Sequence, residues 1–291
     1  MYKARRLGVI GFTLVKFWLL LLCPLGARAG AVFLGPSPYL SFTNSPFNHT
    51  GFNYFYLETL EDGALNTPGV TINNDWITTG PGDLVDSVDA DDGIIDGSGT
   101  NGHSLVSAGT QTNLTLTFNA AALGGQLPTH AGMVCTDIGG VLFGQVGVGD
   151  LTFSARDAAG VLLGSVLFTN FGNGSAQGSG AGATAEDRFF GVINPGGISS
   201  ISLSVNNSVD WEVDHLQYGY FVPELRIQNS ASDTVVLAWS TNAVGYALQE
   251  IPSFPATNWT TVPTPPATVG NEHQVTVTPL SSNRFYRLIG Q

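Results

Sequence analysis

Hydrophobic and polar residues alternate in short runs along most of this chain. In LTLTF at 114–118, an extended backbone places Leu114, Leu116 and Phe118 on one face and two threonines on the other. Gly, Asn, Asp and Pro separate such runs, and no stretch keeps a sustained helical period, with 119–123 the nearest to a helical turn. The pattern predicts strands at 52–57, 70–78, 114–118, 130–136, 151–155, 161–168, 185–192, 198–205 and 209–218.

The spacing of these runs is typical of two-sheet sandwiches, which predicts an all-β protein with a jelly-roll β-sandwich over residues 31–222. Shorter runs follow at 224–228, 234–239, 246–249, 259–262, 274–278 and 285–289. Prolines 263, 265 and 266 lie together in one loop and oppose strand pairing there. We therefore predict a second, small β-sandwich module of fibronectin type III character over residues 223–291.

The N-terminus has the pattern of a secretory signal peptide over residues 1–29. Lys3, Arg5 and Arg6 precede an apolar run at 7–25 that is interrupted by Lys16, and Ala27-Arg28-Ala29 offers small residues for cleavage. The protein is therefore expected to be secreted or held at the cell surface, with no stable membrane insertion after cleavage. The competing interpretation is an uncleaved membrane anchor, because the run approaches spanning length.

Removing residues 1–29 makes the chain strongly acidic. Five of the ten basic residues lie in that segment and all 22 acids lie outside it, so the mature net charge is 5 − 22 = −17, with no lysine left. Such a field makes nucleic acid and anionic membrane surfaces poor partners, and it leaves cations, neutral glycans and other polar surfaces. One cysteine remains, Cys135, and its apolar neighbours predict a buried thiol without a disulfide.

The most acidic stretch is residues 83–99, here called the acidic loop, with six carboxylates, three glycines and no basic residue. Like charges this dense need screening by water or by a shared cation. Carboxylates at gaps of one and two residues beside a glycine suit a hard cation, and the stretch resembles Ca²⁺ loops of the Asp-x-Asp-x-Asp-Gly type. One hypothesis is therefore Ca²⁺ bound by Asp89, Asp91, Asp92 and Asp96, and the other is a solvated acidic loop.

A second acidic pattern occupies residues 210–215, DWEVDH. On a regular strand Asp210, Glu212 and Asp214 share one face, and Trp211, Val213 and His215 share the other. The segment resembles the Glu-x-Asp-x-x-Glu catalytic strand of retaining jelly-roll β-glucanases, with Glu212 and Asp214 in matching positions and Gln217 in place of the third acid. His215 is interpreted as a hydrogen-bonded strand histidine, since no zinc-type histidine spacing is present.

The same strand also suits a structural role. Secreted jelly-roll carbohydrate-binding modules carry acids near the first strand and an Asp on the final strand, and the two share a Ca²⁺ ion. Glu58, Glu61, Asp62 and Asp214 stand in similar places, and this resemblance implies a second candidate Ca²⁺ site at Glu61 and Asp214.

Four segments together resemble a family: YLETLEDGALNTPGV, DSVDADDGIIDGSG, AEDRFFGVINPGGISSI and VDWEVDHLQYG. Residues 33–222 are similar to secreted bacterial proteins of the PEP-CTERM-associated type, an uncharacterised group. The chain then departs from that family, since the small β module stands in place of the apolar sorting tail. The resemblance implies an extracellular jelly roll without an assigned activity.

Taken together, these features predict a non-enzymatic extracellular or cell-surface protein, stabilised by Ca²⁺ and associated with carbohydrate or an extracellular polysaccharide matrix. Two alternatives stay open: a glycoside-active jelly-roll enzyme that uses Glu212 and Asp214, and a purely structural surface protein.

Overall fold

The computed structural model describes residues 30–73, 76–83, 85–107, 111–139, 141–142, 145–146, 149–169, 182–206, 210–231, 234–253, 257–278 and 283–290. The predicted signal peptide lies outside the described residues. Within the described ranges, no helix combines the length and hydropathy that crossing a membrane requires. The described chain is all-β with short 3-10 turns, as the alternation predicts.

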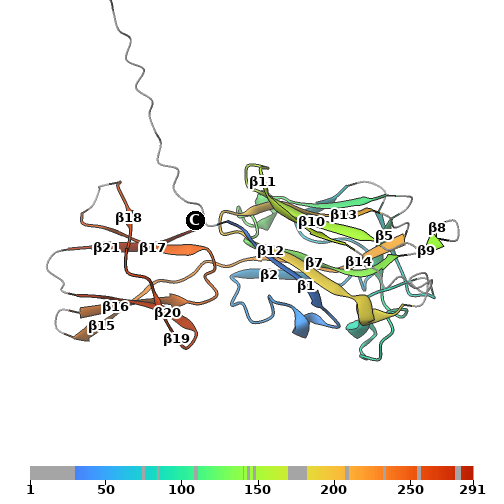
Figure 1. Cartoon of the computed structure of the whole chain (residues 1–291), viewed down its shortest axis with the longest axis horizontal. Helices are drawn as coiled ribbons and strands as arrows, with labels where there is room; N and C mark the ends of the chain where they lie inside the picture. Colours follow the sequence, from blue (N-terminus) through green and yellow to red (C-terminus); the bar gives the residue numbers. More distant parts are fainter. Residues whose placement is uncertain are drawn as a thin grey trace, which may run out of the picture.

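Two antiparallel sheets form the N-terminal sandwich, on the right of Figure 1. One sheet has the order β1 (Val32–Pro38), β12 (Arg188–Ile193), β7 (His130–Gly139), β14 (Asp210–Tyr220), β5 (Ser104–Ser107) and β4 (Trp76–Thr79), and β2 (Tyr54–Glu58) also pairs with β14. The other has the order β11 (Leu162–Phe168), β10 (Asp150–Asp157), β13 (Ile198–Asn206), β6 (Asn113–Phe118) and β3 (Val70–Ile72). A short pair, β8 (Val141–Leu142) and β9 (Gln145–Val146), stands apart from both.

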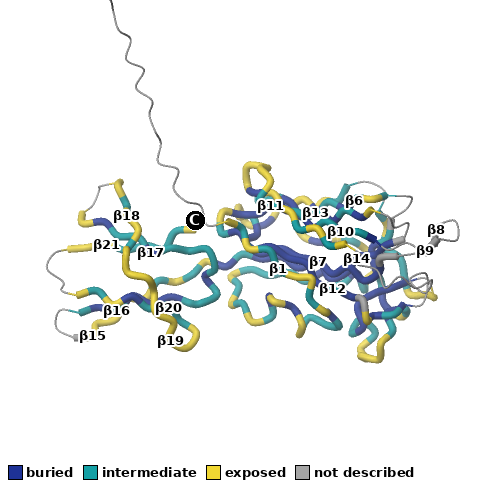
Figure 2. The backbone as a smooth tube through the Cα atoms, in the orientation of Figure 1, coloured by how far each residue is buried: buried dark blue, intermediate teal, exposed yellow. Residues whose placement is uncertain are grey.

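The main core lies between these two sheets, where the buried tube segments of Figure 2 concentrate. Leu114, Leu116 and Phe118 on β6 all point into it, as their alternation predicts. Cys135 on β7 is a buried free thiol in the same core, which confirms the prediction made for it. Apolar burial between two sheets is the main favourable term in the stability of such a sandwich.

The C-terminal strands form two smaller sheets, on the left of Figure 1. One contains β15 (Arg226–Ala231), β16 (Thr234–Ser240), β20 (Glu272–Val277) and β19 (Ala267–Val269), and the other contains β18 (Thr260–Thr261), β17 (Tyr246–Ile251) and β21 (Phe285–Gly290). Leu237, Trp239 and Val275 are buried between them, so Trp239 is a core residue. Trp259 is instead partly covered by the Arg287 guanidinium, 4.3 Å from its ring centre.

The prediction of one strand at 70–78 is wrong. The segment forms β3 and β4, which belong to different sheets of the sandwich. The alternation of apolar and polar residues continues where the chain passes from one sheet to the other. Periodicity alone therefore does not show that β3 and β4 are separate strands. Strands β1 and β5 have no counterpart among the predicted strands, because Gly35, Pro36 and Pro38 interrupt the first and the second spans four residues.

The outer face of the seven-stranded sheet carries a second, smaller apolar cluster. Tyr39, Phe47, Val88, Val134 and Phe189 are all buried there, under the N-terminal segment and the acidic loop. His130 lies beside this cluster, with its ring edge-on to Phe47 and its Nδ1 2.9 Å from the Thr129 Oγ1. Burial lowers the pKa of His130 from 6.5 to about 4, because the protonated ring cannot be solvated there.

This lowered pKa predicts an acid-dependent loss of stability. In the unfolded chain His130 becomes protonated below pH 6.5, whereas in the native protein it stays neutral until about pH 4. The free energy of unfolding therefore falls as the pH drops from 6.5 to about 4. A shift of this size corresponds to about 3 kcal/mol. Urea unfolding measures the free energy of unfolding at pH 7 and at pH 4. We expect its decrease between the two pH values to be smaller in His130→Gln than in the wild type by about that amount. Equal drops in the two proteins would contradict the assignment.

Candidate functional site

The acidic loop lies over the outer face of the seven-stranded sheet and is fastened to β14 through its backbone. The Asp86 amide donates to Glu212 Oε2 at 3.0 Å, and the Val88 amide donates to Asp214 Oδ2 at 3.0 Å. Ser104 on β5 also donates its hydroxyl to Glu212 Oε2. The alternating carboxylates of β14 therefore accept hydrogen bonds from the loop above them.

Asp89 organises the loop from within. Asp89 is the first residue of the 3-10 turn η2 (Asp89–Asp92). Its carboxylate accepts hydrogen bonds from the amides of Asp96 and Gly97 and from the Thr184 hydroxyl. Several donors to one buried carboxylate offset its loss of hydration. Asp89 is thus held by donors from the loop and from the segment before β12.

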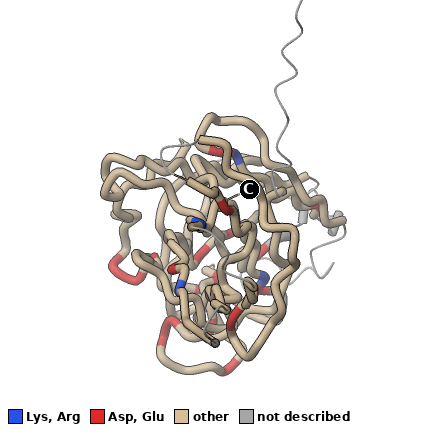
Figure 3. Tube along the Cα trace, turned by 90° about the vertical axis from the view of Figure 1, so that its left-hand side faces the viewer, with Lys and Arg blue, Asp and Glu red and all other residues tan. Residues whose placement is uncertain are grey.

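Asp92 and Asp96 bond locally at the loop surface. Asp92 accepts from the Ile94 amide and from Asn101 Nδ2, and Asp96 accepts from the Ser98 amide. These short side-chain-to-backbone bonds stabilise tight turns. Figure 3, an end-on view, shows acidic segments around the molecule and few basic ones. The assignment of Ca²⁺ to Asp89, Asp91, Asp92 and Asp96 stays a prediction.

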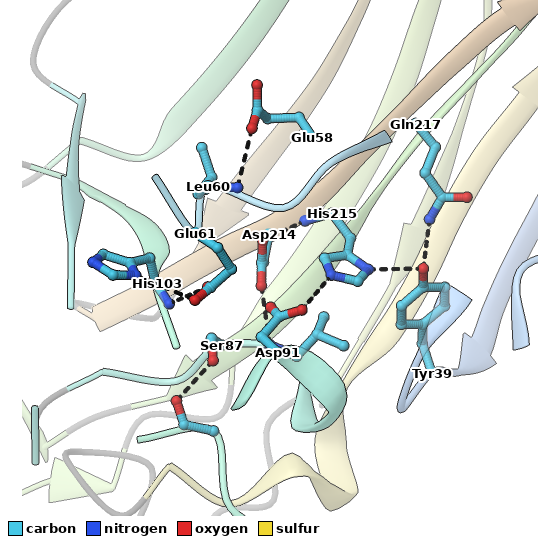
Figure 4. Close-up of polar contacts among 12 residues, drawn as sticks. Tyr39, Glu58, Leu60, Glu61, Ser87, Asp91, His103, Asp214, His215 and Gln217 are labelled. Carbon is cyan, nitrogen blue, oxygen red and sulfur yellow. Dashed lines mark hydrogen bonds and ion pairs between the residues drawn. The ribbon is translucent and has the colours of Figure 1, made fainter. Parts of the chain in front are cut away.

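Asp91 points inward from η2 and meets Asp214 and His215 on β14 (Figure 4). One ligand atom from each of these three residues lies within 4.8 Å of the others, and no other such group of three occurs in the described part of the chain. His215 Nε2 is 2.8 Å from Asp91 Oδ1, and both side chains are at most 6% exposed. The group joins one residue from each predicted Ca²⁺ site to a histidine assigned to neither.

His215 reaches this group because β14 does not stay regular. The prediction that Asp214 and His215 face opposite sides of the strand is wrong: the pairing register between β14 and β7 shifts between Asp214 and Gln217. His215 has φ 44°, a left-handed conformation that costs free energy in a residue with a side chain. This bulge turns the imidazole toward Asp214.

A chain of hydrogen bonds orients the imidazole from behind. Its Nδ1 lies 2.9 Å from the Tyr39 hydroxyl, which accepts a bond from Gln217 Nε2 at 2.9 Å. Ser45 in turn donates to Gln217 Oε1 at 2.5 Å. Gln217 stands where the glucanase pattern has an acid, and here it positions Tyr39. Neither Tyr39 nor Ser45 is found by sequence motif, because both come from the irregular segment after β1.

Electrostatics within the group favour a bound proton or cation. Burial raises the pKa of Asp214 well above its usual range, and the charge of Asp91 and a hydrogen bond to Asp91 raise it further. The amides of Val88 and His215 act in the opposite direction. A compensating positive charge beside two neighbouring carboxylates away from water lowers the cost of burying them.

The acids near β2 lie around this group. Glu58 is buried and accepts from the Leu60 amide and the Thr67 hydroxyl. Glu61 accepts from the His103 amide at 2.6 Å, and its pKa is raised by burial and also by the charge of Asp91. Glu61 therefore neighbours Asp91 while it is held by His103, and its role as a Ca²⁺ ligand stays a prediction.

The burial of Glu212 and Asp214 bears on the glycosidase alternative. Their side chains lie under the acidic loop and are 3% and 1% exposed. A retaining glycosidase needs both carboxylates beside the scissile bond of a bound sugar. In this arrangement no sugar ring can reach either group, which disfavours that use of the strand.

No known family profile matches the chain, and no curated protein sequence does. Seven chains of solved structures match, among them the N-terminal CBM22-1–CBM22-2 tandem domain of Xyn10C from Paenibacillus barcinonensis. That match has 8% identity and a TM-score of 0.31, and it covers 82% of this chain and 85% of the other. A similarity of this size identifies neither a ligand nor an activity.

Asp89 is buried and Asp96 is exposed in the same loop, so the two carboxylates allow a matched comparison of variants. Asp89→Ala removes the acceptor of three amide or hydroxyl donors and should lower the free energy of unfolding by about 2 kcal/mol or more. Asp96→Ala removes an exposed, local bond and should change it by less than about 0.5 kcal/mol. Urea unfolding in the presence of EDTA measures both, and similar values for the two variants would show that Asp89 does not organise the loop.

Proposed function

We propose that this chain is a secreted or cell-surface, non-catalytic β protein whose N-terminal sandwich is stabilised by a divalent cation and whose ligand is an extracellular polysaccharide. The buried Asp91–Asp214–His215 group is the observation that supports the cation. It supports a structural role as well, because the group is covered by the acidic loop and offers a substrate no access.

The residues of the group fit a cation. Ligand atoms up to 4.8 Å apart can be spanned by one ion with bonds of about 2.0–2.4 Å. The histidine has its second nitrogen held by Tyr39, which is how metal-binding histidines are usually oriented. Ca²⁺ is the ion predicted from the sequence, and the imidazole adds Zn²⁺ and Mn²⁺ as alternatives.

A cleft between the N-terminal sandwich and the C-terminal sheets supports the polysaccharide part of the proposal. Its volume is about 430 Å³, within the range of small-ligand sites. Tyr220 and Tyr246 line it together with Gln126 and Thr129, and its lining contains no charged side chain. Aromatic faces beside uncharged hydrogen-bonding groups suit a neutral sugar, even in a protein whose net charge is strongly negative.

A cation bound in the Asp91–Asp214–His215 group should raise the thermal midpoint of the mature protein. An ion at about a hundred times its dissociation constant stabilises the native state by about 2.7 kcal/mol. Ca²⁺, Zn²⁺ and Mn²⁺ are each added after EDTA treatment, to the wild type, to Asp91→Asn and to the exposed control Asp83→Asn. The ion that occupies the group shifts the wild type and the control and leaves Asp91→Asn unchanged. If Asp91→Asn responds to every ion as the wild type does, no cation binds there.

Polysaccharide binding in the cleft should depend on Tyr246. We expect a soluble neutral polysaccharide such as xylan, dextran or a β-glucan to retard the wild-type protein in affinity electrophoresis, and Tyr246→Ala to lose at least about 1 kcal/mol of that affinity. Phe285→Ala, an exposed aromatic outside the cleft, is the control. Retardation by none of the polysaccharides would favour the purely structural surface protein.

A further inference from the structure

Strand β11 ends the five-stranded sheet (Figure 1), and its outer edge pairs with no other strand in the described part of the chain. On its inner side it pairs with β10, regularly from Gly164 to Phe168 after a bulge at the start of the strand. The outer side presents a row of backbone N–H and C=O groups. Such a row is a template for pairing with a strand of another chain.

Terminal strands of sheets usually carry a feature that prevents this pairing, such as a charged residue, a proline or a very short length. Among the described sheets of three or more strands, every other terminal strand has one of these features. Strands β3, β4, β18 and β19 have two to four residues. Strand β1 contains prolines, and β2, β15 and β21 contain Glu58, Arg226 and Arg287. Strand β11 has seven residues, LLGSVLF, with neither a charge nor a proline.

The edge formed by β11 is apolar and exposed. Leu162 and Leu167 are 52% and 61% exposed, and Val161 just before the strand is 61% exposed. Residues 158–185 contain no charged side chain, in a chain whose net charge without residues 1–29 is 5 − 22 = −17. Two copies of this chain repel one another over most of their surface. The uncharged edge is therefore where a second copy meets the least repulsion.

The charges of β10 favour an antiparallel arrangement of two copies. Alternate residues of β10 point into the main core, so Asp150 and Arg156 project from the outer face at opposite ends of the strand. Each is three residues from Phe153, which pairs with Val166 on β11. A two-fold axis at Val166 therefore places Arg156 of each copy level with Asp150 of the other, three strand spacings or about 14 Å away. An attraction at this distance selects direction and register more than it adds affinity.

The same axis brings the exposed apolar side chains together. Val166 of one copy then faces Val166 of the other, and Ser165 faces Leu167. The two Leu167 side chains become diagonal neighbours across the axis, which is within reach of long side chains. Their removal from water favours the pair.

We propose that β11 is a self-association edge, along which two copies of the chain pair antiparallel about a two-fold axis at Val166. The two five-stranded sheets then form one continuous sheet. A two-fold contact is closed, because each copy uses its own edge, so it gives a dimer and not a fibre. The proposal goes beyond the proposed function and does not rest on it, because β11 contributes no residue to the Asp91–Asp214–His215 group or to the cleft.

Sedimentation equilibrium of the mature chain measures the association. We expect a monomer–dimer equilibrium in the wild type at micromolar concentrations. Leu167→Lys places two ammonium groups beside the axis and should raise the dissociation constant at least about tenfold. Ile227→Lys is the matched control, because Ile227 is 59% exposed on the terminal strand β15 of the C-terminal module, and it should leave the constant unchanged.

Cysteine cross-linking tests the register and does not depend on whether the lysine variant folds. Two Val166 residues that face each other have Cα atoms about 4.5–5.5 Å apart, which a disulfide can bridge. Oxidation with diamide should therefore link two copies of Val166→Cys and should not link Ile227→Cys. The native thiol of Cys135 is buried and does not compete.

Three results overturn the proposal. The first is a wild-type protein that stays monomeric at every concentration measured. The second is a dissociation constant that Leu167→Lys and Ile227→Lys change equally, which would place the contact elsewhere. The third is the absence of a cross-link in Val166→Cys.

Discussion

The cost of burying carboxylates in a protein that has almost no basic side chains governs the N-terminal sandwich. Strand β14 presents Glu212 and Asp214 on its outer face, and the acidic loop that covers them adds Asp86, Asp89 and Asp91. Backbone amides of the loop satisfy part of this charge. Hydroxyl groups of Ser104 and Thr184 add further hydrogen bonds, because a buried carboxylate is costly unless it is paired or hydrogen-bonded. The hydrogen bonds that attach the loop to β14 are therefore the same ones that stabilise the buried acids.

The bulge in β14 shows how the sheet adapts to that requirement. A left-handed conformation at His215 is unfavourable for a residue with a side chain, and it persists because Tyr39, Asp91 and the neighbouring strands hold the imidazole in place. Strained positions of this kind concentrate at binding sites. The extra residue lets three polar side chains of one strand, Asp214, His215 and Gln217, face the same covered side.

The two kinds of candidate site lie in different parts of the molecule. The acids are sealed between a sheet and a loop, whereas the cleft lined by Tyr220 and Tyr246 is open and contains no charged side chain. A cation among the buried acids would act on the stability of the fold and would not touch a ligand in the cleft. This separation favours a structural ion over a catalytic one, and it allows ligand affinity and metal affinity to be varied independently.

The sequence by itself determined the β class, the inward faces of strands such as β6, the burial of Cys135 and the irregular, acidic character of residues 83–99. These properties are local, because the alternation of side chains along a strand records which face is buried. Only the tertiary structure decided that 70–78 divides between two sheets, that Asp91 meets Asp214, and that His215 turns to join them. Those outcomes depend on strand pairing between distant segments and on one shift of register, and a shift of one residue changes the face of a side chain without changing the sequence pattern.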